Sequence, residues 1–311
     1  MTAAVIDLGT NTFHLIIVEL SAGDPRTLFK TNLPVKLGEG KINENIIIPE
    51  AFERGIIALK GFKKEIIKHN VEVVKAIATS AIRSAKNGLD FVNAAKAQAG
   101  IDITVINGDQ EADYIYQGVN ATGLIDNTSL IVDIGGGSIE FIICNPGEIL
   151  WKKSYDIGAA RLQQAYFKSD PISRKDQESI RLRLRTELSD LRLICDCHKP
   201  LHLIGSAGAF ESFATMINDD VDIKQLKAST ISISSYFQLS EKLIMSTHSE
   251  RTDFKGLIKL RVDMIVIASL ITNYVMEMIN PEKFSVSTYD LKMGVLPTLI
   301  KHLKEPDKAF Q

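Results

Sequence analysis

The chain has 311 residues, of which 45% are hydrophobic and 24% are charged. These values are typical of a soluble globular protein of about two domains, and they exclude a disordered or fibrous chain. The net charge of −2 gives no overall electrostatic attraction to nucleic acid or to an anionic membrane, so neither is a predicted partner. No apolar stretch reaches the length of about 18 residues that a membrane-spanning helix needs.

The N-terminus and the cysteines both bear on location. No basic region precedes the first apolar stretch, and Asp7 interrupts that stretch, so the sequence predicts no secretory signal. Cys144, Cys195 and Cys197 are too few for a disulfide framework, which fits a reducing compartment. We therefore expect a cytoplasmic protein.

A pattern of apolar strand, glycine-containing turn and second apolar strand occurs twice, at Val5–Val18 and at Ile131–Cys144. Four pairs of positions align with one offset of 126 residues, namely Asp7 with Asp133, Gly9 with Gly135, Thr12 with Ser138 and His14 with Glu140. A solenoid repeats every 20–50 residues or so, which is far shorter. The offset therefore predicts two duplicated domains that begin with the same unit.

Elsewhere the hydrophobic periodicity predicts alternating helices and strands, as in an α/β layer architecture. Between the two copies we expect a helix over Pro49–Asn70, a strand over Val71–Ala78, a helix over Asp90–Ala99, a strand over Ile103–Ile106 and a helix over Gln110–Val119. After the second copy we expect a hairpin through Asn145–Glu148, a helix from Ala159, a long helix over Ser173–Leu193, a strand over Leu201–Ile204, a helix over Leu257–Met278, a strand over Phe284–Thr288 and a helix over Gly294–Leu303.

Glycine-rich turns expose successive backbone N–H groups, which bind phosphate oxygens without a charged side chain. A single turn of this kind is more often just a hairpin, but two in a domain-length repeat favour phosphate binding. The predicted phosphate-binding residues are Gly9, Thr10, Asn11 and Thr12 in the first turn and Gly135, Gly136, Gly137 and Ser138 in the second. The acid that ends the strand before each turn, Asp7 or Asp133, is placed to hold a magnesium ion.

Further motifs accompany the two turns, namely Ala78-Thr-Ser-Ala-Ile-Arg83, Val105-Ile-Asn-Gly-Asp-Gln-Glu-Ala112 and Gly158-Ala-Ala-Arg-Leu162. In order and spacing they resemble the exopolyphosphatase/guanosine pentaphosphate phosphohydrolase family, Ppx/GppA, over nearly the whole chain. The resemblance implies a two-lobed, duplicated α/β fold of the actin/hexokinase/Hsp70 type (ribonuclease H-like) with a cleft between the lobes. The N-terminal lobe would comprise residues 1–124 with 297–311, and the C-terminal lobe residues 125–296.

The resemblance also implies roles for single residues. Glu111 matches the catalytic glutamate that orients or deprotonates the attacking water, and Arg83 matches an arginine that binds phosphate. Asp133 and Glu140 match the positions that hold the divalent metal, for which we expect Mg²⁺, with Asp7 as a supporting ligand. The alternatives are a salt bridge between lobes for Arg83, a carboxylate favoured by the helix dipole for Glu111, and solvated strand-end carboxylates for the metal ligands.

Three places depart from the family pattern. Ile139 replaces a threonine after the second turn, Gly205-Ser-Ala-Gly-Ala209 replaces a loop with Gly-Gly-Thr, and Asp290-Leu-Lys-Met-Gly294 replaces Gly-Leu-Arg-Glu-Gly. In the second of these we still expect Gly205, Ser206 and Gly208 to contact phosphate. The departures leave the proposed chemical core intact and weaken the prediction of the usual substrate.

Two other patterns suggest sites. Cys195, Cys197, His198 and His202 carry zinc-ligand chemistry, but a zinc site usually has a second distant pair of ligands, which this sequence lacks. His14 either approaches the phosphates or is a satisfied polar residue on its strand.

The leading functional hypothesis is an exopolyphosphatase that removes terminal orthophosphate from polyphosphate with Mg²⁺. Hydrolysis of the 5′ γ-phosphate of guanosine pentaphosphate is the alternative within the family. A kinase of the same fold, with an adenosine pocket at Gly205–Gly208, and a non-catalytic phosphate or nucleotide sensor are the alternatives outside it. The resemblance also suggests a homodimer, and the apolar helices late in the chain fit either an interface or a core.

Overall fold

A computed structural model describes residues 1–20, 25–206, 208–218 and 221–304, and the chain divides into two compact units. Unit 1 comprises Met1–Gly118 with the chain from Leu291 onward, and unit 2 comprises Val119–Asp290. The sequence placed the divisions after residues 124 and 296. The second division falls earlier because the last helix packs on unit 1 from its start, where it contacts β1. Residues 305–311 of the predicted N-terminal lobe lie outside the described residues.

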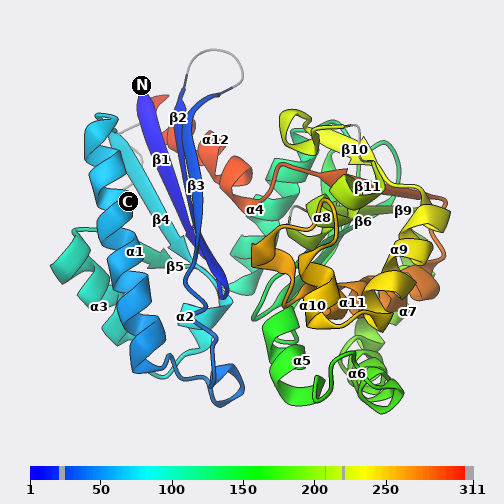
Figure 1. The fold of residues 1–311 in the computed structure, drawn as a ribbon. Coiled ribbons are helices and arrows are strands. Elements are labelled where there is room, and N and C mark those ends of the chain that lie inside the picture. The colour runs from blue at the N-terminus through cyan, green and yellow to red at the C-terminus, as the bar shows by residue number, and fades with distance from the viewer. Residues whose placement is uncertain (21–24, 207, 219–220, 305–311) are drawn as a thin grey trace. The chain divides into compact units, whose positions relative to one another are not determined.

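Unit 1 is built on a five-stranded sheet in the order β3-β2-β1-β4-β5 (Figure 1). β1 and β2 are antiparallel, as are β2 and β3, whereas β4 is parallel to β1 and β5 is parallel to β4. The strands are β1 (Thr2–Leu8), β2 (Thr12–Glu19), β3 (Arg26–Pro34), β4 (Val73–Ala78) and β5 (Ile103–Val105). The helices are α1 (Pro49–Lys68), α2 (Ser80–Ser84), α3 (Gly88–Ala99), α4 (Gly108–Asn120) and α12 (Leu291–Lys304).

Unit 2 repeats this plan in a six-stranded sheet with the order β10-β11-β9-β6-β7-β8. Here β6, β7 and β8 correspond to β1, β2 and β3, while β9 and β11 correspond to β4 and β5, with the same antiparallel and parallel pairings. The strands are β6 (Ser129–Ile134), β7 (Ile139–Asn145), β8 (Glu148–Tyr155), β9 (His202–Ser206), β10 (Ala228–Thr230) and β11 (Lys283–Ser287). The predicted duplicated α/β fold is therefore confirmed.

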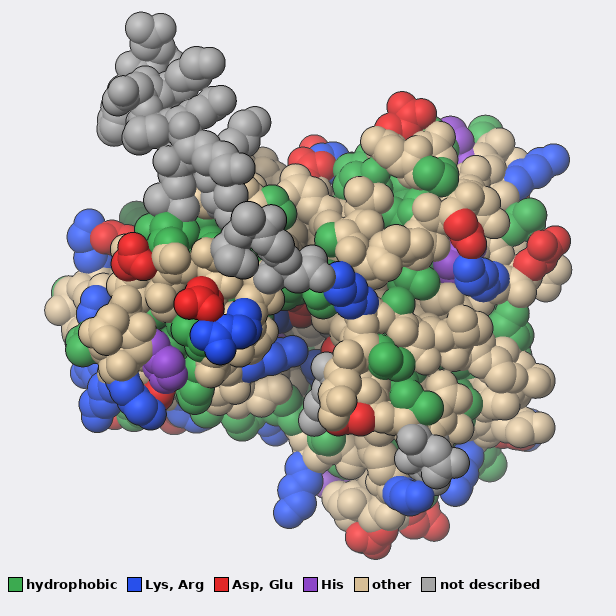
Figure 2. Space-filling view, turned by 90° about the horizontal axis from the view of Figure 1, so that it is seen from above, with side chains coloured by type: hydrophobic (Ala, Val, Ile, Leu, Met, Phe, Trp, Pro, Cys, Tyr) green, Lys and Arg blue, Asp and Glu red, His purple; other side chains and the backbone are tan. Residues whose placement is uncertain are grey.

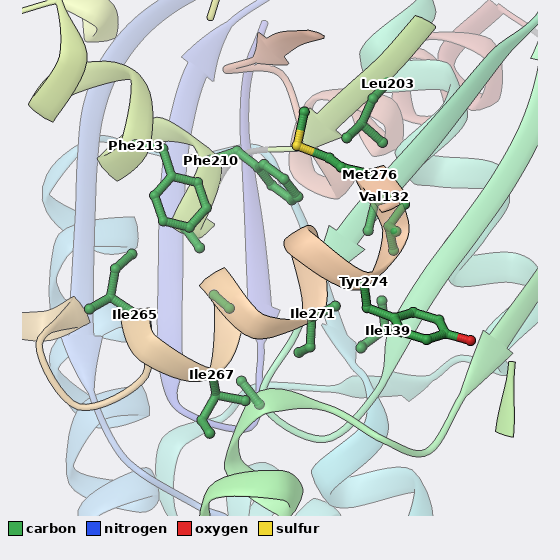
Figure 3. Close-up of a cluster of buried hydrophobic side chains, with 14 of the residues drawn as sticks. Val132, Ile139, Leu203, Phe210, Phe213, Ile265, Ile267, Ile271, Tyr274 and Met276 are labelled. Carbon is green, nitrogen blue, oxygen red and sulfur yellow. The ribbon is translucent and has the colours of Figure 1, made fainter. Parts of the chain in front are cut away.

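The helices of unit 2 bury a large apolar core against its sheet. They are α5 (Ala159–Tyr166), α6 (Arg174–Glu187), α7 (Ser189–His198), α8 (Gly208–Ile217), α9 (Ile233–Met245), α10 (His248–Thr252) and α11 (Ile265–Ile279). Figure 3 shows residues of α11 and α8 packed with side chains of β6, β7 and β9. The ring of Phe210 meets Phe213 and Phe284 edge-on, a geometry that favours aromatic pairs. Unit 2 therefore has its own core, as a domain should.

Two predicted helices differ in the structure. The long helix over Ser173–Leu193 is broken at Leu188 into α6 and α7. Leu184, Leu188 and Leu191 are all buried in the core. Their i, i+4, i+7 spacing is that of one continuous helix, so the apolar pattern does not reveal the break. The helix predicted from Leu257 begins at Ile265, because residues before it form a 3₁₀ turn at Lys259–Arg261.

The surface agrees with the composition. On the face drawn in Figure 2, basic and acidic side chains are interspersed. None of the helices in the described part of the chain has the length and apolar character needed to cross a bilayer.

His202, at the start of β9, is fully buried and lies close to the charged side chains of Asp126 and Lys283. Its Nε2 lies 2.9 Å from Ser285 Oγ, and its Nδ1 lies 3.5 Å from Asp126 Oδ1. Burial, helped by the charge of Lys283, lowers the pKa of His202 from 6.5 to about 4, although Asp126 opposes the shift. The neutral imidazole is therefore the form that the fold favours.

The lowered pKa of His202 predicts a loss of stability in mild acid. Between pH 6.5 and 4 the unfolded chain binds a proton at His202 that the folded chain does not bind. Titration of His202 therefore leaves the free energy of unfolding unchanged above pH 6.5 and lowers it by about 3 kcal/mol as the pH drops to 4. Urea unfolding of the wild type and of His202→Gln at pH 7, 5.5 and 4.5 measures this. We expect a steeper decline for the wild type, and parallel declines would contradict the assignment to His202.

Candidate active site

Loop 1, Gly9–Thr12, joins β1 to β2 and is held in a tight turn. Gly9 N donates to Thr12 O at 3.2 Å, and a Cβ on Gly9 would lie only 2.9 Å from that oxygen. The outer part of the loop accepts two further bonds, from Lys36 N to Asn11 O and from Gly38 N to Thr10 O. Thr10 and Thr12 are buried, and the Oγ1 of Thr12 has no hydrogen-bond partner among the described atoms. A buried hydroxyl without a partner is costly, and a ligand would satisfy it.

Loop 2, Gly135–Ser138, has the same geometry between β6 and β7. A Cβ on Gly135 would lie 2.9 Å from Ser138 O, as at the equivalent pair Gly9 and Thr12. The carbonyls of the three glycines face the start of α5, since Gly135, Gly136 and Gly137 accept bonds from the backbone N–H groups of residues 158–161. In a planar trans peptide the N–H points opposite to the C=O. The N–H groups of Gly136, Gly137 and Ser138 are therefore directed away from α5, as a phosphate-binding nest requires.

The start of α5 explains why glycine and arginine occur in the motif Gly158-Ala-Ala-Arg-Leu162. A Cβ on Gly158 would lie 2.5 Å from backbone atoms of Gly136 and Gly137, so only glycine allows this approach. Arg161 is buried, and its Nε donates to Gly137 O at 2.9 Å. Both residues thus stabilise loop 2 on the side that faces α5.

Asp133 and Glu140, the predicted metal ligands in unit 2, are directly opposite each other on β6 and β7. Opposite residues of an antiparallel pair project from the same face with Cβ atoms about 5 Å apart, so both carboxylates lie together beside loop 2. Ser206 Oγ donates to Asp133 at 2.8 Å, and Ser154 Oγ donates to Glu140 at 2.6 Å. Each carboxylate is therefore held in place by a serine hydroxyl.

Ser154 is a site residue that sequence reasoning missed. It lies opposite Glu140 in the β7–β8 register. Counting back from the predicted hairpin at Asn145–Glu148 would have given Lys153 instead, because the register shifts by one residue between Ile143 and Cys144. The sequence predicts a phosphate contact for Ser206. In the structure its hydroxyl donates a hydrogen bond to Asp133.

The donor set suits a magnesium ion better than a softer metal. Magnesium is usually held by one or two carboxylates and completes its shell with water and substrate phosphate oxygens. Asp133 and Glu140 supply those two carboxylates. Within the described residues, no cluster of three or more His, Cys, Asp or Glu side chains is arranged to hold a metal. The residues present therefore fit a partly open magnesium site in unit 2.

In unit 1, the buried Glu111 forms an ion pair with the half-buried Arg83. Arg83 Nη1 lies 2.7 Å from Glu111 Oε2 and 3.2 Å from Ile106 O, and Glu111 is only 7% exposed. Arg83 thus pairs within its own unit, whereas one alternative was a bridge between lobes. Asn107 and Gln110 exchange side-chain and backbone bonds at the start of α4, a capping-box arrangement that sets where the helix begins and so where Glu111 projects.

The remaining predicted phosphate contacts are at the end of β9. A Cβ on Gly205 would lie 2.1 Å from the ring of Phe210, so this glycine is required for packing of the core. Gly208 has a φ of +54°, and its missing Cβ would lie 3.8 Å from Arg261 Nη1. Ala207 between them lies outside the described residues. Burial lowers the pKa of Arg261, and the negative charges of Glu211, Asp133 and Asp290 oppose that shift.

The structure thus adds Arg261 to the residues around Asp133. No motif in the sequence analysis singled it out, and its position depends on the 3₁₀ turn at Lys259–Arg261. The other patterns are not assembled into sites. Cys195 is buried and Cys197 is exposed on α7. His14 is different, because it lies opposite Asp7 in the β1–β2 register and therefore on the same face beside loop 1, and its approach to phosphate stays a prediction.

Comparison with known proteins places these features in a family. The model of the Ppx/GppA phosphatase family matches residues 16–303. The chain belongs to this family. Its fold is similar to the crystal structure of an exopolyphosphatase from Cytophaga hutchinsonii, with 36% identity, a TM-score of 0.93 and coverage of 97% of this chain and 98% of the other.

Two further members are similar over almost the whole chain. The Ppx/GppA family member from Aquifex aeolicus has 26% identity, a TM-score of 0.79 and coverage of 98% of both chains. A guanosine-5'-triphosphate,3'-diphosphate pyrophosphatase from Aliivibrio fischeri is 26% identical over 98% of this chain, but the chain spans only 60% of that relative. The predicted family resemblance is confirmed.

Proposed function

We propose that this chain is an exopolyphosphatase, which hydrolyses the terminal phosphoanhydride of inorganic polyphosphate and releases orthophosphate. The observation that carries the proposal is the combination of two glycine loops of the same geometry with the Arg83–Glu111 ion pair and the Asp133–Glu140 pair. The similarity to the Cytophaga hutchinsonii exopolyphosphatase over nearly the full length of both chains supports it.

In this proposal, Glu111 orients a water molecule toward the terminal phosphorus and accepts its proton. The new P–O bond forms as the bridging P–O bond breaks, and the shortened polyphosphate leaves with the bridging oxygen. Arg83 keeps the Glu111 carboxylate in position. The backbone N–H groups of loop 2 bind non-bridging oxygens, whose negative charge they stabilise.

We propose Mg²⁺ as the cofactor, with Asp133 and Glu140 as its protein ligands. The bound ion would neutralise phosphate charge beside loop 2. Asp7, the third predicted ligand, belongs to unit 1. We also propose a cytoplasmic location, supported by the unpaired state of all three cysteines. The homodimer remains a prediction from the family resemblance.

Guanosine pentaphosphate is the alternative substrate, favoured by the similarity to the Aliivibrio fischeri pyrophosphatase. The exopolyphosphatase from Cytophaga hutchinsonii has the higher identity, 36% against 26%, which supports polyphosphate as the first choice.

The test measures orthophosphate release by the full chain from long-chain polyphosphate, guanosine pentaphosphate and ATP, each with MgCl₂ or with EDTA. We expect release from polyphosphate that EDTA abolishes. Faster release from guanosine pentaphosphate would favour the alternative substrate. No release from any compound would overturn the hydrolase proposal and favour a phosphate or nucleotide sensor.

A further inference from the structure

Lys292, in the first turn of α12, is a buried lysine beside the first phosphate loop. Its Nζ lies 3.8 Å from Asp7 Oδ2, and the two side chains are only 6% and 16% exposed. Asp7 is near the end of β1, next to loop 1. The chain thus returns from its C-terminal part to place a cation at the base of this loop.

Close packing of α12 against its neighbours holds the backbone of Lys292 in place. α12 contacts β1, and at Gly294 its backbone approaches α4 so closely that a Cβ would lie 1.8 Å from Tyr114 O and 3.0 Å from Gly118 N. Such an approach leaves α12 little freedom to slide or rotate. Lys292, two residues before Gly294, is therefore anchored by the backbone of its own helix.

A buried ion pair needs an explanation other than stability. Removing each ion from water costs several kcal/mol, and a well-packed apolar pair is often as stable or more so. Buried charges of this kind are concentrated at functional sites. The pair also changes what Asp7 can do, because the neighbouring ammonium repels a second cation and offsets the carboxylate charge.

Loop 1 supplies a second, independent sign of a ligand. Asp7 and Thr12 lie at the same end of the β1–β2 hairpin, where Leu8 pairs with Phe13. The Thr12 hydroxyl is buried and has no hydrogen-bond partner among the described atoms. A phosphate oxygen would accept that hydrogen bond and would also be attracted to the Lys292 ammonium.

We propose that Lys292 is a phosphate-binding residue of unit 1, positioned by Asp7 and assisted by the Thr12 hydroxyl. Unit 1 would then bind phosphate with a built-in cation, whereas unit 2 uses a metal ion, and Asp7 would be a positioning residue for Lys292 in place of a metal ligand. The inference rests on the proposed function for its ligand, a polyphosphate oxygen.

The test measures binding of tripolyphosphate to the full chain in EDTA by calorimetry, so that neither metal nor hydrolysis is involved. Lys292→Met removes the charge at similar volume and should weaken binding about tenfold or more, as loss of a hydrogen bond to a charged group does. Lys292→Arg should stay within a few-fold of the wild type. The control is Lys96→Met, which removes an exposed lysine paired with Asp102 and should leave binding unchanged.

Thr12→Val provides an arm that does not depend on the folding of the lysine variant. It removes a hydroxyl that has no hydrogen-bond partner in the part of the chain that the structure describes, so it should not destabilise the fold. It should weaken tripolyphosphate binding about threefold or more. Wild-type affinity in Thr12→Val and in a folded Lys292→Met would overturn the proposal. Wild-type protein that binds tripolyphosphate but releases no orthophosphate with MgCl₂ would instead contradict the proposed hydrolysis and leave this site standing.

Discussion

Replacing Glu111 by Gln is expected to lower the kcat/KM for orthophosphate release by about a hundredfold or more, since a positioned general base contributes at least that much. Glutamine has the same shape and can still accept the bond from Arg83 Nη1, but it cannot take a proton from water. The measurement is orthophosphate release from polyphosphate at saturating MgCl₂ by purified wild type and variant.

Asp109→Asn is the matched control for Glu111→Gln. Asp109 is also an acid in the first turn of α4, but it is exposed, so its replacement should change the rate less than twofold or so. Tripolyphosphate binding should be retained in both variants, because Glu111 acts on water in this mechanism. A Glu111→Gln variant with more than about a tenth of wild-type kcat/KM would show that another group activates the water.

Replacing Glu140 by Gln should raise the Mg²⁺ concentration for half-maximal activity by about tenfold or more, because loss of one of two charged ligands weakens a hard cation site strongly. Glutamine preserves an oxygen for the bond from Ser154, so the strand register and loop 2 should remain. A Mg²⁺ titration of the rate, from micromolar to tens of millimolar, compares wild type and variant.

Glu148→Gln, in the same β7–β8 hairpin, is the control for Glu140→Gln. Glu148 is exposed and bonded only to Asn145 in the described part of the chain, so its loss should leave the Mg²⁺ dependence unchanged. An identical Mg²⁺ midpoint in Glu140→Gln and wild type would remove Glu140 from the metal site. Asp133, which accepts a hydrogen bond from Ser206, would then be the remaining proposed metal ligand in unit 2.

The duplication could be predicted from sequence because its signals are local. A strand shows in a two-residue alternation or an apolar run, and a tight turn shows in its glycine. The repeated placement of Asp7 and Asp133 therefore identified β1–β2 and β6–β7 and, with them, both phosphate loops. The break at Leu188 was missed because the buried residues Leu184, Leu188 and Leu191 keep the i, i+4, i+7 spacing of a continuous helix across it.

The candidate site was only partly accessible to sequence reasoning. The types and order of Arg83, Glu111, Asp133 and Glu140 were recognisable as motifs. Their partners were not, because a hydrogen bond from Ser154 or Ser206 depends on strand register across the sheet. Gly205 shows a second reason for a glycine, since the ring of Phe210 leaves no room for a Cβ there, while its predicted phosphate contact stays a prediction.

The sequence by itself determined the two-domain α/β repeat, the two glycine turns and the acids that follow or precede them, because each depends on residues close together in the chain. Only the tertiary structure decided that Arg83 pairs with Glu111 and that Lys292 pairs with Asp7. Those pairs join residues far apart in sequence, and their distances are set by how helices pack on the sheet. The residue types therefore indicated the chemistry, whereas the packing of the fold determined the partner of each charged group.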